Sequence, residues 1–167
     1  MTADLSAEFT FADRTTRDLF RIYRATLNEL RTRGIIRTDN APAGDYAEYL
    51  VHRALGGDLA TNSKKSWDVE TADHERIQVK CRVVSAPMLP GHRQLSAFRS
   101  FDFDAAVIVF FSDADYGVIR AVKIPRALVE ANSKHRKHDN SNVFHATESL
   151  LADPSVIDVT DLIRAAA

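Results

Sequence analysis

The feature that most constrains how this chain can fold is an alternating run near its middle, Arg76-Ile-Gln-Val-Lys-Cys-Arg-Val83. Apolar residues take every second position and polar residues take the positions between, which is the pattern of a strand with one covered and one open face. The positions expected on the covered face are Ile77, Val79, Cys81 and Val83. The positions expected on the open face are Gln78, Lys80 and Arg82.

A shorter run with the same alternation lies just upstream, at residues 67–71, and carries Asp68 and Glu70 at its polar positions. The residues between the two runs, 72–74, are of the kinds that form turns. The two runs are therefore expected to pair as an antiparallel hairpin.

The length of the turn determines which side chains share a face of this hairpin. Directly opposed residues of an antiparallel pair lie on the same face, and a loop over 72–74 places Thr71 opposite Glu75. The same register places Asp68 opposite Gln78, with Lys80 next along that face. An acid, an amide and a lysine are thus predicted to lie together.

A helix is predicted over residues 43–55, because its apolar residues recur at helical spacing and Gly56 and Gly57 follow it. Glu48 lies at the border of the apolar surface of this helix, so we expect it to point into a partly covered site. The alternative is an ordinary exposed helix carboxylate.

In this order, the residues resemble the PD-(D/E)xK nuclease superfamily, the fold of many restriction and repair endonucleases. The resemblance covers roughly residues 42–124. It implies an α/β fold with a restriction-endonuclease-like core in the order αβββαβ, in which helices flank a central mixed sheet of four to five strands. A further helix over residues 15–33 is expected to precede this core, with Thr15 as its cap and Gly34 as its stop.

The resemblance also implies roles for particular residues. In the family, the acid on the second strand, here Asp68, binds Mg²⁺, and the middle residue of the third-strand motif, here Val79, offers its backbone carbonyl. The lysine, here Lys80, orients or deprotonates the attacking water, and an acid from the first helix, here Glu48, often completes the metal shell. Gln78 stands where Glu or Asp is usual, a variant similar to that of the Mrr-type restriction enzymes, and it removes one anionic ligand.

The chemistry of phosphodiester hydrolysis independently requires residues of these kinds. The reaction needs a hard cation that neutralises charge on the phosphoryl oxygens, and Mg²⁺ prefers carboxylate oxygens. Asp68 and Glu48 supply carboxylates, and Lys80 can accept a proton or stabilise negative charge. We therefore expect a Mg²⁺-dependent deoxyribonuclease of the restriction or repair type, with Mn²⁺ able to replace Mg²⁺.

Two other classes of function stay open. Any solvent-facing hairpin carries acids, amides and lysines, so the chain can be an α/β scaffold without a nucleic-acid role. It can also be an inactive nuclease fold kept as a nucleic-acid-binding or partner-binding module, with Gln78 marking the loss of catalysis. For an active enzyme that cuts both strands we expect a homodimer, while a nickase or a subunit of a larger restriction or repair complex is equally compatible.

The formal net charge of −1 means that any DNA contact must come from local basic clusters. A second helix is expected over residues 95–101, where it would bring Arg93 or Arg99 near the phosphate. A basic run at 134–138 is either a phosphate contact or the polar end of a helix. The candidate nucleic-acid contacts are Lys64, Lys65, Arg82 and Arg99.

The whole chain is expected to form one nuclease-like domain over residues 1–167, with a core at about 42–133 between terminal extensions at about 1–40 and 134–167. The single cysteine, Cys81, is predicted to be a small core residue. The sequence shows neither a signal peptide nor an apolar stretch of membrane-spanning length, so we expect a cytoplasmic protein without a membrane partner. The remaining predicted elements are strands at 105–111 and 117–124, a helix at 125–132, a strand at 156–159 and a short helix after Thr160.

Overall fold

The computed structural model describes the chain except for residues 1–9, 39, 62–65, 86 and 139. Lys64 and Lys65, two of the expected nucleic-acid contacts, lie outside the described residues. The chain divides into two compact units, Met1–Pro42 and Ala43–Ala167, each of which is described by itself.

The first unit contains one long helix, α1 (Thr16–Thr32), which confirms the predicted N-terminal helix. Its first turn is capped as expected, because Oγ1 of Thr15 accepts a hydrogen bond of 3.2 Å from the backbone N–H of Asp18. It ends before Gly34, whose φ of +71° lies in the left-handed region that glycine adopts without strain. No helix among the described residues combines the length and the apolar character that crossing a bilayer requires.

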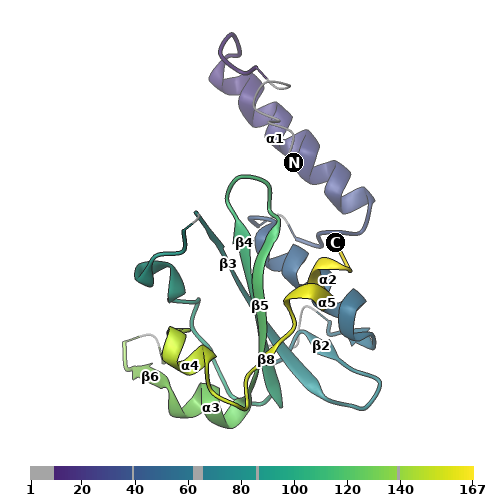
Figure 1. Cartoon of the computed structure of the whole chain (residues 1–167). Helices are drawn as coiled ribbons and strands as arrows, with labels where there is room; N and C mark the ends of the chain where they lie inside the picture. The colour runs from purple at the N-terminus through teal and green to yellow at the C-terminus, as the bar shows by residue number, and fades with distance from the viewer. Residues whose placement is uncertain (1–9, 39, 62–65, 86, 139) are drawn as a thin grey trace. The chain divides into compact units, whose positions relative to one another are not determined.

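The second unit is built on a mixed six-stranded sheet in the order β1-β2-β3-β4-β5-β8, which confirms the predicted α/β class (Figure 1). Strands β3 and β4 are parallel, and all the other neighbouring pairs are antiparallel. The expected four to five strands are too few, because residues 58–59 add the unpredicted strand β1 at one edge, while the strand predicted at 156–159 pairs at the other edge as β8 through Val122–Asp158. The strands are β1 (Asp58–Leu59), β2 (Val69–Glu70), β3 (Arg76–Val84), β4 (Ala105–Ser112), β5 (Val118–Pro125) and β8 (Ile157–Asp158).

Both faces of the sheet are covered. On one face, α2 (Ala43–Leu55) packs against β3 and α5 (Thr160–Arg164) packs against β5, and both helices join one apolar cluster with alternate residues of β3 and β4. The other face carries a second apolar cluster, to which α3 (Arg126–Ala131), β7 (Ser141–Phe144) and α4 (Glu148–Leu151) contribute. The other elements of this unit are the 3₁₀ helix η2 (Pro90–Arg93) and the strand β6 (Ser133–Arg136). Strand β4 is a continuous apolar run because it is buried from both sides.

Helix α2 begins and ends at the predicted residues, and Gly56 and Gly57 follow it with φ of +72° and +89°. Gly57 is required for a second reason, since a Cβ at this position would lie 2.0 Å from the carbonyl oxygen of Glu70. The chain can therefore turn closely past β2, which brings α2 and the predicted hairpin together.

The helix predicted over residues 95–101 is wrong. This segment is extended and lies beside β7, where it forms isolated bridges between Gln94 and His145 and between Phe98 and Asn142. The N–H of Phe98 donates to the carbonyl of Asn142 at 2.8 Å, and the return bond measures 2.9 Å. The backbone N–H and C=O groups of this segment thus find hydrogen-bond partners more than forty residues further along the chain, and not within a helix.

The basic run at 134–138 is not the end of a helix either. Helix α3 ends at Ala131, and the chain enters β6, which pairs with β7 as an antiparallel hairpin. Of the five residues, Lys134, His135 and Arg136 lie on the strand and the other two lie in the turn. Their exposure is therefore set by the hairpin and not by a helix terminus.

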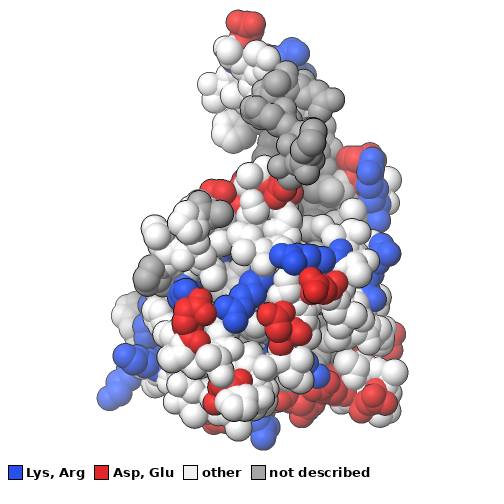
Figure 2. Space-filling view, viewed as in Figure 1, with Lys and Arg blue, Asp and Glu red and all other residues white. Residues whose placement is uncertain are grey.

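Charged side chains of both signs are interspersed on the face of the molecule that Figure 2 shows. Some of the arginines are neutralised locally: Arg93 and Arg120 both form ion pairs with Glu148. Arg93 was one of two candidates for a phosphate contact, and this ion pair together with its 14% exposed side chain removes it from that role.

Candidate active site

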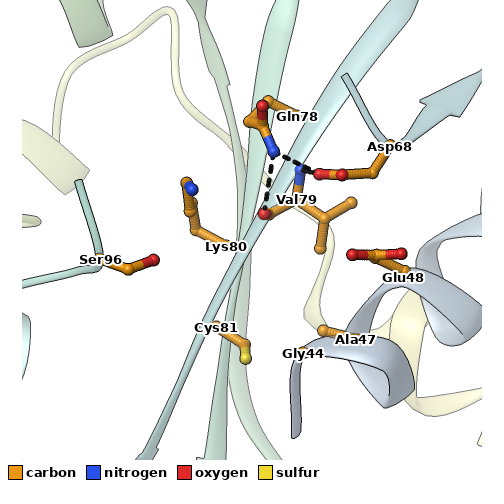
Figure 3. Close-up of a pocket in the computed structure, with 9 residues that line it drawn as sticks. All are labelled: Gly44, Ala47, Glu48, Asp68, Gln78, Val79, Lys80, Cys81 and Ser96. Carbon is orange, nitrogen blue, oxygen red and sulfur yellow. Dashed lines mark hydrogen bonds between the residues drawn. The ribbon is translucent and has the colours of Figure 1, made fainter. Parts of the chain in front are cut away.

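A pocket of about 240 Å³ lies at the edge of β3, next to the residue that precedes β2 (Figure 3). It contains all four predicted catalytic side chains, which come from α2, from the residue before β2 and from β3. The residues that line it are Gly44, Ala47, Glu48, Asp68, Gln78, Val79, Lys80, Cys81 and Ser96.

The predicted hairpin register is confirmed, since Val69 pairs with Ile77 and Glu70 with Arg76. At Asp68, however, the ladder becomes irregular: its N–H donates at 2.8 Å to the carbonyl of Ile77, the residue that is already the partner of Val69. Two residues on one strand facing a single residue on the other is the arrangement of a β-bulge, which re-aims a side chain. Asp68 therefore does not continue the strand opposite Gln78 as expected.

The bulge directs the Asp68 carboxylate onto the backbone of β3. Its Oδ2 accepts the N–H of Val79 at 2.7 Å and also a hydrogen bond from Nε2 of Gln78. The same Nε2 lies 3.5 Å from the carbonyl oxygen of Val79. Carboxylate, amide and carbonyl thus converge on one point at the strand edge, as Figure 3 shows.

Glu48 reaches the pocket from α2. It is half-buried, and Figure 3 shows its carboxylate next to Val79, on the same side of β3 as the Asp68 carboxylate. The preceding residue, Ala47, is fully buried in the cluster between α2 and the sheet, which fixes the orientation of the helix. The structure therefore places Glu48 in the pocket and not on a fully exposed helix face.

Lys80 lies on the other side of the strand edge, towards Ser96 (Figure 3). Its Nζ donates to the carbonyl oxygen of Ala97 at 3.3 Å and lies 5.1 Å from the centre of the Phe98 ring. Burial lowers the pKa of Lys80 below its ordinary value, although the nearby Asp68 carboxylate opposes this shift. A larger fraction of Lys80 is therefore neutral at a given pH than for an exposed lysine.

Cys81 was expected to be a core residue, but it is only partly buried and it lines the pocket. Burial raises the pKa of its thiol to about 11, and the Glu48 carboxylate acts in the same direction. The thiol is therefore uncharged at neutral pH and contributes no anionic ligand.

The expected nucleic-acid contacts that the structure describes have different environments. The guanidinium of Arg82 donates to the carbonyl oxygen of Gln94, which ties it to the segment between β3 and β4. Arg99 is exposed and lines a second pocket of about 590 Å³, which shares Ser96 with the first. Arg99 is thus exposed beside the candidate site, whereas the guanidinium of Arg82 is engaged in a hydrogen bond within the protein.

The donor atoms at the pocket are hard oxygens. Outside the gaps at 1–9, 39, 62–65, 86 and 139, the chain shows no cluster of three or more His, Cys, Asp or Glu side chains that could hold a metal ion. The pocket instead combines the carboxylates of Asp68 and Glu48 with the carbonyl of Val79 and the amide of Gln78. This set fits Mg²⁺, which takes few carboxylates and retains waters, and does not fit the nitrogen and sulfur preference of Zn²⁺.

Besides Cys81, three residues of the pocket were not anticipated from the sequence. Gly44 lies one helical turn before Glu48, so helical spacing alone would have placed it on the same face. Ala47 adjoins Glu48 and was assigned only to packing. Ser96 belongs to the segment mistaken for a helix, and no local pattern indicates its position.

Comparison with known proteins assigns no family to this chain. No protein-family model matches it, and no curated protein matches it. The geometry around Val79 and the chemistry of the side chains gathered there are therefore what indicates a function.

Proposed function

We propose that this protein is a Mg²⁺-dependent endonuclease that hydrolyses DNA phosphodiester bonds. The observation that carries the proposal is the convergence of Glu48, Asp68, Gln78 and Lys80 on one small pocket around the backbone of Val79. These residues come from a helix, a bulge and a strand. A solvated hairpin face would not place a half-buried helix carboxylate and a desolvated lysine beside the same strand edge.

The metal would be held by Asp68, Glu48 and the carbonyl of Val79. Bound there, Mg²⁺ supplies a Lewis acid that polarises the scissile phosphoryl group and lowers the pKa of water. Gln78 takes the position of a usual third carboxylate. Its amide offers both an N–H donor and a carbonyl oxygen, and a 180° rotation of the amide group exchanges their positions. Gln78 can therefore orient either water or Asp68.

Lys80 would act on the attacking water. Its Nζ is held by the carbonyl of Ala97, so its position is fixed before substrate binds. The lowered pKa favours accepting a proton from water, while the protonated form would stabilise the negative charge that develops on the phosphoryl oxygens. Both roles require the ammonium or amine group at the pocket.

The experiment that tests this function is incubation of the purified protein with supercoiled plasmid and with linear duplex DNA, in Mg²⁺, in Mn²⁺ and in EDTA. We expect metal-dependent nicking or linearisation and no reaction in EDTA. Duplex binding without cleavage in any metal would support the inactive binding module instead. Neither binding nor cleavage would favour a scaffold without a nucleic-acid role.

Cleavage of both strands of a duplex by one site per chain would require two chains, so we propose a homodimer. Exposed apolar side chains on α1 offer a surface for association, among them Phe20 and Tyr23 with 69% and 51% of their surface exposed. Light scattering coupled to size-exclusion chromatography should give twice the chain mass of 18.6 kDa. A monomeric mass together with nicking alone would identify a nickase or a subunit of a larger complex.

A further inference from the structure

The hairpin formed by β6 and β7 carries the densest run of basic residues in the chain, Lys134-His-Arg-Lys-His138, and all five are exposed. Lys134 pairs with Val143 and Arg136 with Ser141, so these two basic side chains share one face of the hairpin. Neither Lys134 nor Lys137 forms an ion pair with an acidic side chain that the structure describes. In Figure 2, basic side chains gather at the end of the molecule where Figure 1 places β6.

The hairpin is fixed against the segment that borders the candidate active site. Two backbone hydrogen bonds join Phe98 to Asn142, and the N–H of Leu95 donates to the carbonyl of Phe144 at 3.1 Å. The rings of Phe98 and Phe144 pack edge to face with their centres 6.0 Å apart. Phe98 also lies beneath Nζ of Lys80, so the hairpin and the candidate active site are anchored to the same residue.

A pocket of about 590 Å³ connects these two regions. It is lined by Asn140 and Ser141 from the turn end of the hairpin and by Ser96, Ala97 and Arg99 from the segment between β3 and β4. Ser96 also lines the candidate active site. A guanidinium, two hydroxyls and an amide are groups that bind phosphate oxygens, and Arg99 forms no ion pair with an acid in the described part of the chain.

We propose that the β6–β7 hairpin and this pocket bind the backbone phosphates of a nucleic-acid duplex on one side of the cleaved bond. Successive side chains on one face of a strand are about 6.6 Å apart, so Lys134 and Arg136 present two separate cations to a phosphate backbone. With a net charge of −1, the protein attracts DNA only through such a local surface. The position relative to the cleaved bond rests on the proposed function, whereas the binding itself needs no cleavage.

The test is fluorescence anisotropy of a labelled 30-base-pair duplex, titrated in EDTA at several salt concentrations. We expect Lys134→Ala/Lys137→Ala to weaken binding about tenfold or more at low salt. The slope of log K against log salt should fall by about 2 for this variant and by about 1 for Arg99→Ala, because each lost phosphate contact removes about 0.9.

Two controls distinguish an effect of the charges on this surface from an effect of misfolding and from an effect of the total charge of the protein. Lys134→Arg/Lys137→Arg keeps both charges and should bind like the wild type. Arg53→Ala removes one exposed charge from the end of α2, outside the surface in question, and should leave both affinity and slope unchanged. The proposal would be overturned by a wild-type protein that does not bind the duplex, or by unchanged binding of both Lys134→Ala/Lys137→Ala and Arg99→Ala. A loss of affinity in Arg53→Ala as large as in these variants would overturn it too.

The result is distinguishable from the outcome of the cleavage experiment. If binding depends on the hairpin and no metal supports cleavage, the proposed binding surface is supported and the proposed nuclease activity is rejected. If the protein cleaves DNA and binding does not depend on the hairpin, the nuclease activity is supported and the binding surface is rejected.

Discussion

The backbone N–H of Val79 donates a hydrogen bond of 2.7 Å to Oδ2 of Asp68. Strand β2 begins at Val69, opposite Ile77, and therefore does not extend along this part of β3, so the carboxylate occupies the place of a backbone acceptor. Asp68 therefore has two roles, since it completes the edge of the sheet and it supplies a carboxylate to the pocket. The two roles can be separated by substitution.

Asp68→Asn retains an oxygen that can accept the Val79 N–H, whereas Asp68→Ala removes it. We expect Asp68→Ala to lose roughly 1–3 kcal/mol of unfolding free energy because a partly buried N–H loses its partner. Asp68→Asn should lose less, while both variants should lose at least about 100-fold in cleavage because the charge is gone. Urea denaturation gives the free energies, and an Asp68→Ala variant as stable as the wild type would show that the bond has no structural role.

Gln78→Glu introduces a third carboxylate beside those of Asp68 and Glu48 in the pocket. Without metal, the new charge faces Asp68 and replaces a hydrogen bond by repulsion, so the variant should lose roughly 1–3 kcal/mol of stability in EDTA. Mg²⁺ should raise its melting temperature by more than it raises that of the wild type, because binding to the folded state alone stabilises it. Thermal scans with and without Mg²⁺ measure this difference, and equal shifts for the two proteins would mean that the side chain at position 78 does not contact the metal.

The thiol of Cys81 should react slowly with alkylating reagents. Burial raises its pKa to about 11, so at pH 8 the thiolate fraction is roughly 100-fold smaller than for a free cysteine. Reaction with iodoacetamide, followed by mass spectrometry, should stay slow at pH 8 and accelerate as pH rises towards the thiol pKa. A rate at pH 8 like that of a cysteine peptide would contradict the burial of this side chain beside Glu48.

Asp104 is expected to contribute to the loss of stability in acid. The backbone N–H of Arg76 donates to its Oδ2 at 2.9 Å and lowers the pKa of Asp104, with further help from the Arg76 guanidinium. A carboxyl with a lowered pKa in the folded state stabilises the protein above its unfolded pKa of about 3.9, and this contribution disappears as pH falls through the folded pKa. The stability of Asp104→Asn should therefore fall less than that of the wild type between about pH 5 and acid pH. Urea midpoints across this range measure the effect, and parallel curves for the two proteins would exclude it.

Much of the candidate site could be predicted because its elements are local. The alternation of residues 76–83 and the turn at 72–74 were enough to establish the hairpin register, and the glycines after Leu55 established the end of α2. Both features depend on neighbours within a few residues, where periodicity and turn chemistry are informative. The approach of Glu48 to the pocket followed from its place at the border of an apolar helix face.

Most of the remaining features depend on partners far along the chain. Residues 95–101 became extended because β7 supplies hydrogen bonds from residues 142–145. The basic run differs, because its partner is the adjoining strand of the β6–β7 hairpin, in which Arg136 lies opposite Ser141. The bulge at Asp68 was not predicted because a single extra backbone bond to Ile77 leaves no trace in the pattern. Ser96 and the second pocket follow from these long-range contacts, so local reasoning could not place them.

The central claim is that Lys80 acts at a metal-dependent hydrolytic site, and single-turnover cleavage of an end-labelled duplex in Mg²⁺ tests it most directly. The comparison is between the wild type, Lys80→Ala and Lys123→Ala, a matched lysine that forms an ion pair of 2.6 Å with Glu75 and does not line the pocket. We predict a loss of about 100-fold or more for Lys80→Ala and a rate near that of the wild type for Lys123→Ala. A wild type without Mg²⁺-dependent cleavage, or a Lys80→Ala variant that cleaves at the wild-type rate, would contradict the account.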